Sequence, residues 1–145
     1  MSFTDIALKN GHVIHFRSGV FSGETLTADV KSASAVLFVL TEKPDFSLVS
    51  HFLSSGANYD YLEICCVGPN AKEMHDNIDD EIVASDTTGI VTTWFKNGEE
   101  ACEYFVYALG AIYPDIIVLV GANADISQLI RQTKTGAEQN TNEHS

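Results

Sequence analysis

Carboxylates form the densest group of side chains that could do chemistry in this sequence. Six of them fall within fourteen positions, opposed only by Lys72, and they are Glu73, Asp76, Asp79, Asp80, Glu81 and Asp86. Unpaired carboxylates are costly to remove from water, so we expect these side chains to face solvent or a cationic partner. The spacing predicts either a solvated surface or a docking surface for a basic protein. The partner-binding residues are then Glu73, Asp76, Asp79, Asp80 and Glu81.

This acidic stretch does not have the spacing of a metal site. An EF-hand loop needs a glycine at its sixth position, and residues 76–87 have Glu81 there. The histidines lack the helical or cysteine-adjacent spacings that bind zinc, and they are His12, His15, His51, His75 and His144. No Gly-x-Ser-x-Gly sequence marks a serine nucleophile. We therefore expect neither a metal nor a cofactor, and we assign no catalytic residue.

A second candidate site follows from the polar residues that end the apolar runs. Open α/β sheets bind ligands at the carboxyl ends of their strands, where helix N-termini favour anions. The residues at or near these ends are Lys43, Trp94, Lys96, Asn97 and Asn123. They predict a site for a small anionic ligand; the alternative is that the lysines simply lie in exposed loops and that Trp94 packs on a flanking helix. No glycine-rich nucleotide motif accompanies them.

The three cysteines suggest packing more than redox chemistry. Cys65 and Cys66 are adjacent in an apolar run, Cys102 falls in a helical pattern, and no Cys-x-x-Cys pair is present. A reactive thiolate needs a nearby cation or a helix N-terminus. We expect three buried, inert thiols in a reducing compartment.

Four apolar runs alternate with helical patterns along the chain. The runs cover residues 35–40, 61–67, 89–95 and 116–120. The helix after the third run is expected to be capped by Asn97, with Glu100 in the capping-box position, and to end at Pro114. Such alternation predicts an α/β fold with a single doubly wound, flavodoxin-like sheet, mainly parallel, whose four core strands lie in the order 2-1-3-4.

The two ends of the chain carry weaker patterns. His12–Arg17 and Thr25–Thr27 predict an N-terminal edge hairpin, or one added edge strand, within the first thirty residues. From Thr133 the sequence is polar, without aromatic or β-branched aliphatic residues, which predicts a disordered tail over 133–145. Residues 1–132 would then form one α/β domain.

Charge and hydropathy narrow the range of partners. The net charge is −12, and the eight basic residues are scattered rather than grouped into a stripe. Nucleic acids and anionic membrane surfaces are therefore not expected as partners, whereas cationic proteins are favoured. Met1–Lys9 lacks the apolar core of a signal peptide, and no apolar run approaches the ~20 residues that span a bilayer. We expect a cytoplasmic protein.

One short motif carries a family resemblance. The run Ile90–Phe95 ends in Thr-Thr-Trp-Phe and is followed by Glu99-Glu100-Ala101 and by Tyr104-Phe105. In this the chain resembles small uncharacterised bacterial α/β domains that pair a Thr-Thr-Trp strand end with an acidic, aromatic helix. The resemblance covers roughly residues 35–122. It implies the fold and a bacterial origin, and it brings no activity and no catalytic residue.

These observations support two functional hypotheses. The first is a non-enzymatic interaction domain that binds a basic protein through its acidic helical face, as an immunity or inhibitor protein does. The alternative is a small-molecule-binding domain, or an enzyme, with its site at the carboxyl edge of the sheet. Enzymes concentrate titratable groups in a cleft, whereas this sequence places its acids on predicted helix surfaces, which favours the first hypothesis.

Overall fold

Four strands form from the apolar runs of the sequence, because such runs can bury side chains on both faces of a sheet. They are β3 (Ala35–Leu40), β4 (Tyr61–Val67), β5 (Ile90–Phe95) and β6 (Asp115–Val120). The computed structural model describes residues 3–18, 35–41, 49, 60–84, 89–120 and 126–142. The four strands pair in parallel within one sheet, which confirms the predicted fold class.

The order of the strands differs from the prediction. The sheet runs β1-β2-β6-β3-β4-β5, so the four predicted strands lie in the order 4-1-2-3, and the expected 2-1-3-4 is wrong. Residues 116–120 of β6 are all buried, which suits an interior position. β5 carries Thr92 and Thr93 and has no fully buried residue, which suits an edge. The predicted order would have placed the polar strand inside and the apolar strand at the edge.

An antiparallel hairpin supplies the two remaining strands. β1 (Phe3–Ala7) pairs with β2 (Val13–Ser18), and β2 continues the sheet by pairing in parallel with β6. The expected strand at His12–Arg17 is therefore present, and its hairpin partner lies upstream. The other candidate, Thr25–Thr27, lies outside the described residues. The hairpin gives β6 a neighbour on its second side.

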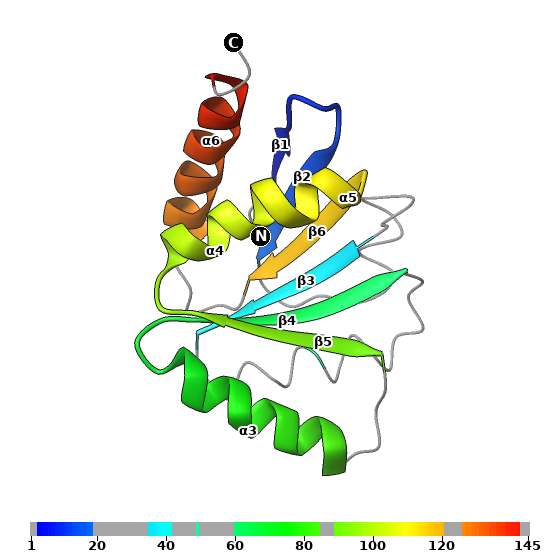
Figure 1. Ribbon diagram of the computed structural model, residues 1–145, viewed down its shortest axis with the longest axis vertical. Coiled ribbons are helices and arrows are strands. Elements are labelled where there is room, and N and C mark those ends of the chain that lie inside the picture. Colours follow the sequence, from blue (N-terminus) through cyan, green and yellow to red (C-terminus); the bar gives the residue numbers. More distant parts are fainter. Residues whose placement is uncertain are drawn as a thin grey trace.

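Helices cover both faces of the sheet (Figure 1). α3 (Ala71–Ala84) packs on one face, in a core that also contains Val49. The other face carries α4 (Gly98–Tyr104), the π-helical η2 (Phe105–Leu109) and α5 (Gly110–Ile112), which follow one another directly, together with α6 (Ile126–Asn142). None of the helices in the described part of the chain combines the length and apolar character needed to span a membrane.

The helix that follows β5 begins and ends where the sequence predicts. The Asn97 side chain accepts a hydrogen bond from the Glu100 backbone N–H at 2.9 Å, and the helix stops two residues before Pro114. Near its end, a Cβ at Gly110 would collide with the Leu8 side chain, so glycine allows the hairpin to approach closely. His12 fixes this contact, because its Nδ1 lies 2.7 Å from the Gly110 carbonyl oxygen.

The C-terminal segment corrects a second expectation. α6 continues to Asn142, whereas a disordered tail was predicted from Thr133. Thr133 is fully buried and donates to the Leu129 carbonyl oxygen at 2.8 Å, and Gly136 is buried against Val106. The prediction rested on the lack of bulky apolar side chains. Small residues instead let the backbone of α6 lie close to η2. The two helices therefore pack tightly without large apolar side chains between them.

Candidate functional site

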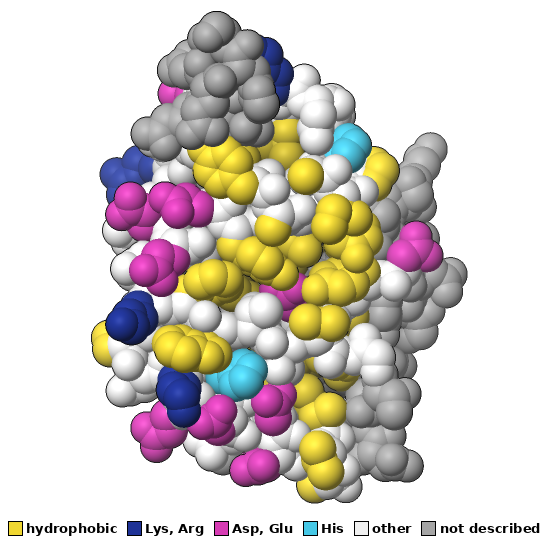
Figure 2. Space-filling model, in the orientation of Figure 1, with side chains coloured by type: hydrophobic (Ala, Val, Ile, Leu, Met, Phe, Trp, Pro, Cys, Tyr) yellow, Lys and Arg dark blue, Asp and Glu magenta, His cyan; other side chains and the backbone are white. Residues whose placement is uncertain are grey.

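α3 presents the predicted acidic surface. Its buried residues Ala71, Met74 and Ile78 recur at helical spacing and face the sheet, so the acids fall on the outer side. Figure 2 shows acidic side chains gathered over this helix. The predicted binding residues divide into exposed Glu73, Asp76 and Asp80 and partly exposed Asp79 and Glu81. All five therefore lie at least partly in solvent, as the cost of burying carboxylates required.

Two of these acids are held by neighbouring side chains. Asp76 lies 3.4 Å from Lys72 Nζ and 3.2 Å from His75 Nδ1. The His75 hydrogen bond, and to a lesser extent Lys72, lower the pKa of Asp76 below its usual value. Asp79 accepts a hydrogen bond from the Thr92 hydroxyl at 2.6 Å, which joins α3 to β5. Asp79 is thus a structural contact as well as a surface charge.

A hydroxyl, an imidazole and a carboxylate also lie in series here. Thr92 Oγ1 lies 3.1 Å from His75 Nε2, and His75 Nδ1 faces Asp76. This is the sequence of groups in hydrolase triads. In a triad, however, the hydroxyl proton goes to the imidazole, whereas Thr92 donates its proton to Asp79. The cluster is therefore arranged to join helix to strand, and it does not activate Thr92 as a nucleophile.

The second predicted site, at the carboxyl edge of the sheet, is only partly described by the structure. Trp94 is 37% exposed near the end of β5, and Lys96 is exposed. Asn97 uses its side-chain oxygen as the helix cap, so this acceptor is already occupied. Lys43 and Asn123 lie outside the described residues. Within the described part of the chain, the structure thus places three of the five predicted ligand-binding residues near one strand end and engages one of them in capping.

The least expected feature is a fully buried carboxylate, Glu63, in the middle of β4. Its Oε1 accepts hydrogen bonds from the hydroxyls of Tyr61 and of Tyr104, the latter at 2.6 Å. Its Oε2 accepts from the Thr93 hydroxyl at 2.8 Å. Three donors thus surround one carboxylate, and no ion pair to Glu63 is found among the described residues.

The surroundings of Glu63 are aromatic. Tyr61 stacks on Tyr113 with ring centroids 5.0 Å apart, and Tyr104 lies 5.2 Å from Phe95. Burial, and then the Glu63 carboxylate, raise the pKa of both Tyr61 and Tyr104 well above the usual range. Both hydroxyls therefore keep their protons at neutral pH and remain donors. One signal of this site is visible in the sequence, namely a lone acid, Glu63, within an otherwise apolar and aromatic strand.

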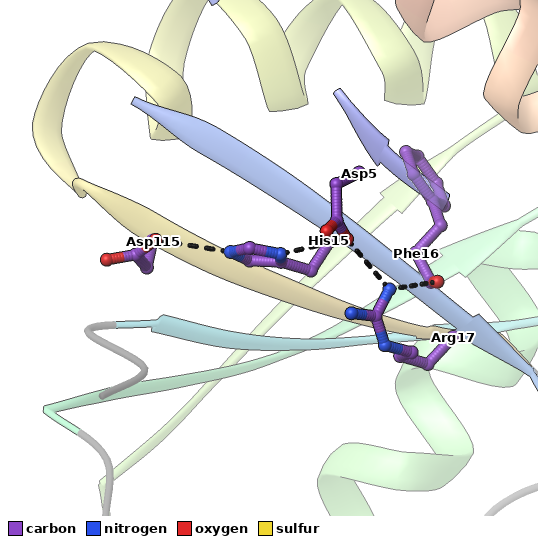
Figure 3. Close-up of polar contacts among 5 residues, drawn as sticks. All are labelled: Asp5, His15, Phe16, Arg17 and Asp115. Carbon is purple, nitrogen blue, oxygen red and sulfur yellow. Dashed lines mark hydrogen bonds and ion pairs between the residues drawn. The ribbon is translucent and has the colours of Figure 1, made fainter. Parts of the chain in front are cut away.

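A third polar cluster fixes the N-terminal hairpin (Figure 3). His15 on β2 lies between Asp5 on β1 and Asp115 on β6, at 3.0 and 3.1 Å from their carboxylate oxygens. Arg17 is almost fully buried and donates to Asp5 at 3.0 Å and to the Phe16 carbonyl oxygen at 2.8 Å. These contacts link three neighbouring strands, which gives the cluster a structural role.

The cysteines are buried as predicted. The exposed fraction is zero for Cys65 and Cys66 and 2% for Cys102. Burial raises the pKa of Cys66 to about 12 and that of Cys102 to about 11, and it raises the pKa of Cys65 further. Across the described ranges of the chain, no three His, Cys, Asp or Glu side chains are grouped so as to hold a metal ion.

Comparison with known proteins places the chain in a family without assigning it an activity. A family model described as a domain of unknown function (DUF7684) matches residues 20–133, and the chain belongs to this family. A search of curated proteins found no match. The matched residues include Glu63 with its hydroxyl donors and the whole of α3. The N-terminal hairpin, β1 and β2, lies outside them.

Proposed function

We propose that this chain is a non-enzymatic interaction domain that binds a basic protein partner through the outer face of α3. The observation that carries the proposal is the exposure of Glu73, Asp76 and Asp80 on one helix of a chain with a net charge of −12. A surface of one charge sign accelerates the encounter with an oppositely charged partner. An inhibitor or immunity protein works in this way.

The edge strand β5, which lies next to α3, adds features suited to binding a partner at the same surface. β5 pairs only with β4 among the described strands, so its outer backbone groups face away from the sheet. Trp94 alternates with Thr92 along β5 and therefore faces the side of the sheet that α3 covers. Tryptophan is over-represented among residues that dominate binding energy, and the unpaired backbone groups of an edge strand favour pairing with another chain. The acids would guide the partner, and Trp94 would hold it.

The alternative site at the carboxyl edge receives less support. It needs polar groups that remain available to a ligand, and Asn97 is engaged as a helix cap. The acidic surface needs no such rearrangement, because its exposed carboxylates already face solvent. We therefore base the functional proposal on α3.

The proposal is tested by association kinetics with a partner captured by affinity purification and identified by mass spectrometry. Replacing Glu73, Asp76 and Asp80 together by Gln, Asn and Asn should slow association roughly tenfold or more at low salt, within the range of electrostatic steering. The dissociation rate should change less, and added salt should reduce the difference. Asp79 is left intact, because its bond to Thr92 would confuse binding with stability.

A matched control removes the same number of charges elsewhere. Replacing Glu99, Glu100 and Glu103 on α4 by Gln gives the same net charge but leaves α3 unchanged. Association should then stay close to that of the unmodified protein. Equal slowing by the two triple variants would mean that net charge, and not the α3 surface, guides the partner. An unchanged rate in the α3 variant would reject the proposal.

A further inference from the structure

A cavity of about 300 Å³ lies between α4 and α6, on the face of the sheet opposite α3. It is lined by Glu99, Glu103, Arg131, Gln132, Thr135 and Gly136. This volume is at the lower end of the range for small-molecule sites. The helices that form its walls are fixed to each other, because Cys102 Sγ donates to the Leu129 carbonyl oxygen at 3.4 Å and both groups are buried.

The charged side chains of the cavity are exposed, and none is paired with another side chain in the part of the chain that the structure describes. Among the described residues, the carboxylates of Glu99 and Glu103 and the guanidinium of Arg131 make neither an ion pair nor a side-chain hydrogen bond. Glu99 and Glu103 are four residues apart on one helix, where like charges repel. Figure 2 shows acidic and basic side chains close together where α4 meets α6. The cavity thus presents two negative charges and one positive charge to solvent, none of them in an ion pair with another described residue.

We propose that this cavity binds a small α-amino acid with a basic side chain, such as free L-lysine or L-arginine. Such a molecule carries two cationic groups and one carboxylate, which is the complement of the three unpaired charges. The two cationic groups bind Glu99 and Glu103. The α-carboxylate binds Arg131, whose planar guanidinium can donate two parallel hydrogen bonds to it. This inference is independent of the proposed α3 surface, because it uses other residues on the other face.

The local structure suits a ligand of this kind. Thr135 donates its hydroxyl to the Arg131 carbonyl oxygen at 3.0 Å, a contact within α6 beside the guanidinium-bearing residue. Gly136, which is buried against Val106, also lines the cavity, so part of its wall is formed by a residue without a polar side chain. The apolar stem of lysine or arginine can lie there while its charged ends reach the two helices.

The test measures binding of L-lysine to the full chain by titration calorimetry and by amide shifts in NMR spectra. Three analogues each remove one ligand charge: norleucine lacks the side-chain cation, Nα-acetyl-lysine lacks the α-ammonium, and lysinamide lacks the carboxylate. Each should bind about five- to tenfold more weakly than L-lysine, between the effects of an exposed ion pair and of a charged hydrogen bond. Amide shifts should be confined to α4 and α6.

Matched protein variants locate the site. Glu103→Gln and Arg131→Gln should each weaken L-lysine binding about five- to tenfold. In Arg131→Gln, lysinamide and L-lysine should bind equally, because the partner of the carboxylate has been removed. The controls Glu100→Gln and Lys134→Gln change the same charges on the same helices outside the cavity lining and should bind normally. The absence of shifts on α4 and α6 at millimolar L-lysine, or binding of the three analogues as tight as that of L-lysine itself, would overturn the proposal.

Discussion

Two regions of this molecule hold carboxylates in opposite ways. On α3, Asp76 and Asp79 stay in or near water and are contacted by a lysine, a histidine and a threonine. On β4, Glu63 is fully buried and is contacted by three hydroxyl groups. Water screens the first group and leaves it available to a partner. The second group depends wholly on the donors that its surroundings supply, so it should contribute far more to stability than to binding.

The two cysteines of β4 lie on opposite faces of the sheet, so each reports on one of the two regions. Cys65 points to the side of Glu63 and Cys66 to the side of α3, because adjacent strand residues face opposite sides. Burial raises the pKa values of both thiols and of Cys102. All three should therefore react with a thiol reagent at least about a hundredfold more slowly in the native protein than in denaturant. Mass spectrometry of the labelled peptides measures each site. Rapid native labelling of Cys66 alone would show that the α3 side opens.

Removing the buried carboxylate should have a large effect on stability. Glu63→Ala leaves the hydroxyls of Tyr61, Tyr104 and Thr93 without their acceptor and should lower the free energy of unfolding by about 2–4 kcal/mol. Glu63→Gln keeps an oxygen for the tyrosines and should cost about 1 kcal/mol or less. Urea denaturation measures both. Asp80→Ala on α3 is the exposed control and should change stability by at most about 0.5 kcal/mol.

If Glu63→Ala loses as little unfolding free energy as Asp80→Ala, the buried and exposed carboxylates do not differ in their contribution to stability. The hydroxyl groups would then have found other partners. A variant with Gln at position 63 that loses as much as the Ala variant would show instead that the negative charge itself is needed. Either result would separate hydrogen-bond satisfaction from charge at this site.

Substitutions of the individual acids of α3 should change the free energy of unfolding by smaller and unequal amounts. Asp79→Ala removes the acceptor of the Thr92 hydroxyl and should cost about 1 kcal/mol of unfolding free energy. Asp76→Ala removes an exposed pair with Lys72 and should leave the free energy of unfolding almost unchanged, because water and salt screen such pairs. Thr92→Val should reproduce the loss seen in Asp79→Ala, and the double variant should lose little more. Fully additive losses would contradict the bond between α3 and β5.

The smallest effect concerns the protonation of Asp76. Its pKa should lie below the usual value for aspartate, and His75→Gln should raise it, because the largest lowering contribution comes from the His75 hydrogen bond. A lowered pKa means that the unfolded chain binds the proton more tightly. The stabilising contribution of Asp76 is therefore complete above the usual pKa of about 3.9 and is lost as the pH falls through the lower, folded value. NMR titration of the side-chain carboxyl carbon measures both pKa values, and an unchanged value in His75→Gln would contradict this account.

The acidic surface was readable from the sequence, and the buried site was not. Carboxylates at helical spacing must face outward whatever the helix packs against. The sequence alone therefore predicts that the acidic face of α3 is exposed to solvent. Glu63 depends on Thr93, 30 positions away, and on Tyr104, 41 positions away. A local pattern can show that an acid lies in an apolar strand, but it cannot show which distant hydroxyl groups will meet it.

The sequence by itself determined the four parallel strands, the Asn97 cap and the burial of the cysteines, because apolar runs, capping side chains and helical spacing act over a few residues. Tertiary structure decided the strand order, the joining of Glu63 to its donors and the extension of α6 past Thr133. In each case the outcome depends on which segments become neighbours. β6 became an interior strand because the hairpin paired with its free side, and α6 was extended because its small residues fit closely against η2.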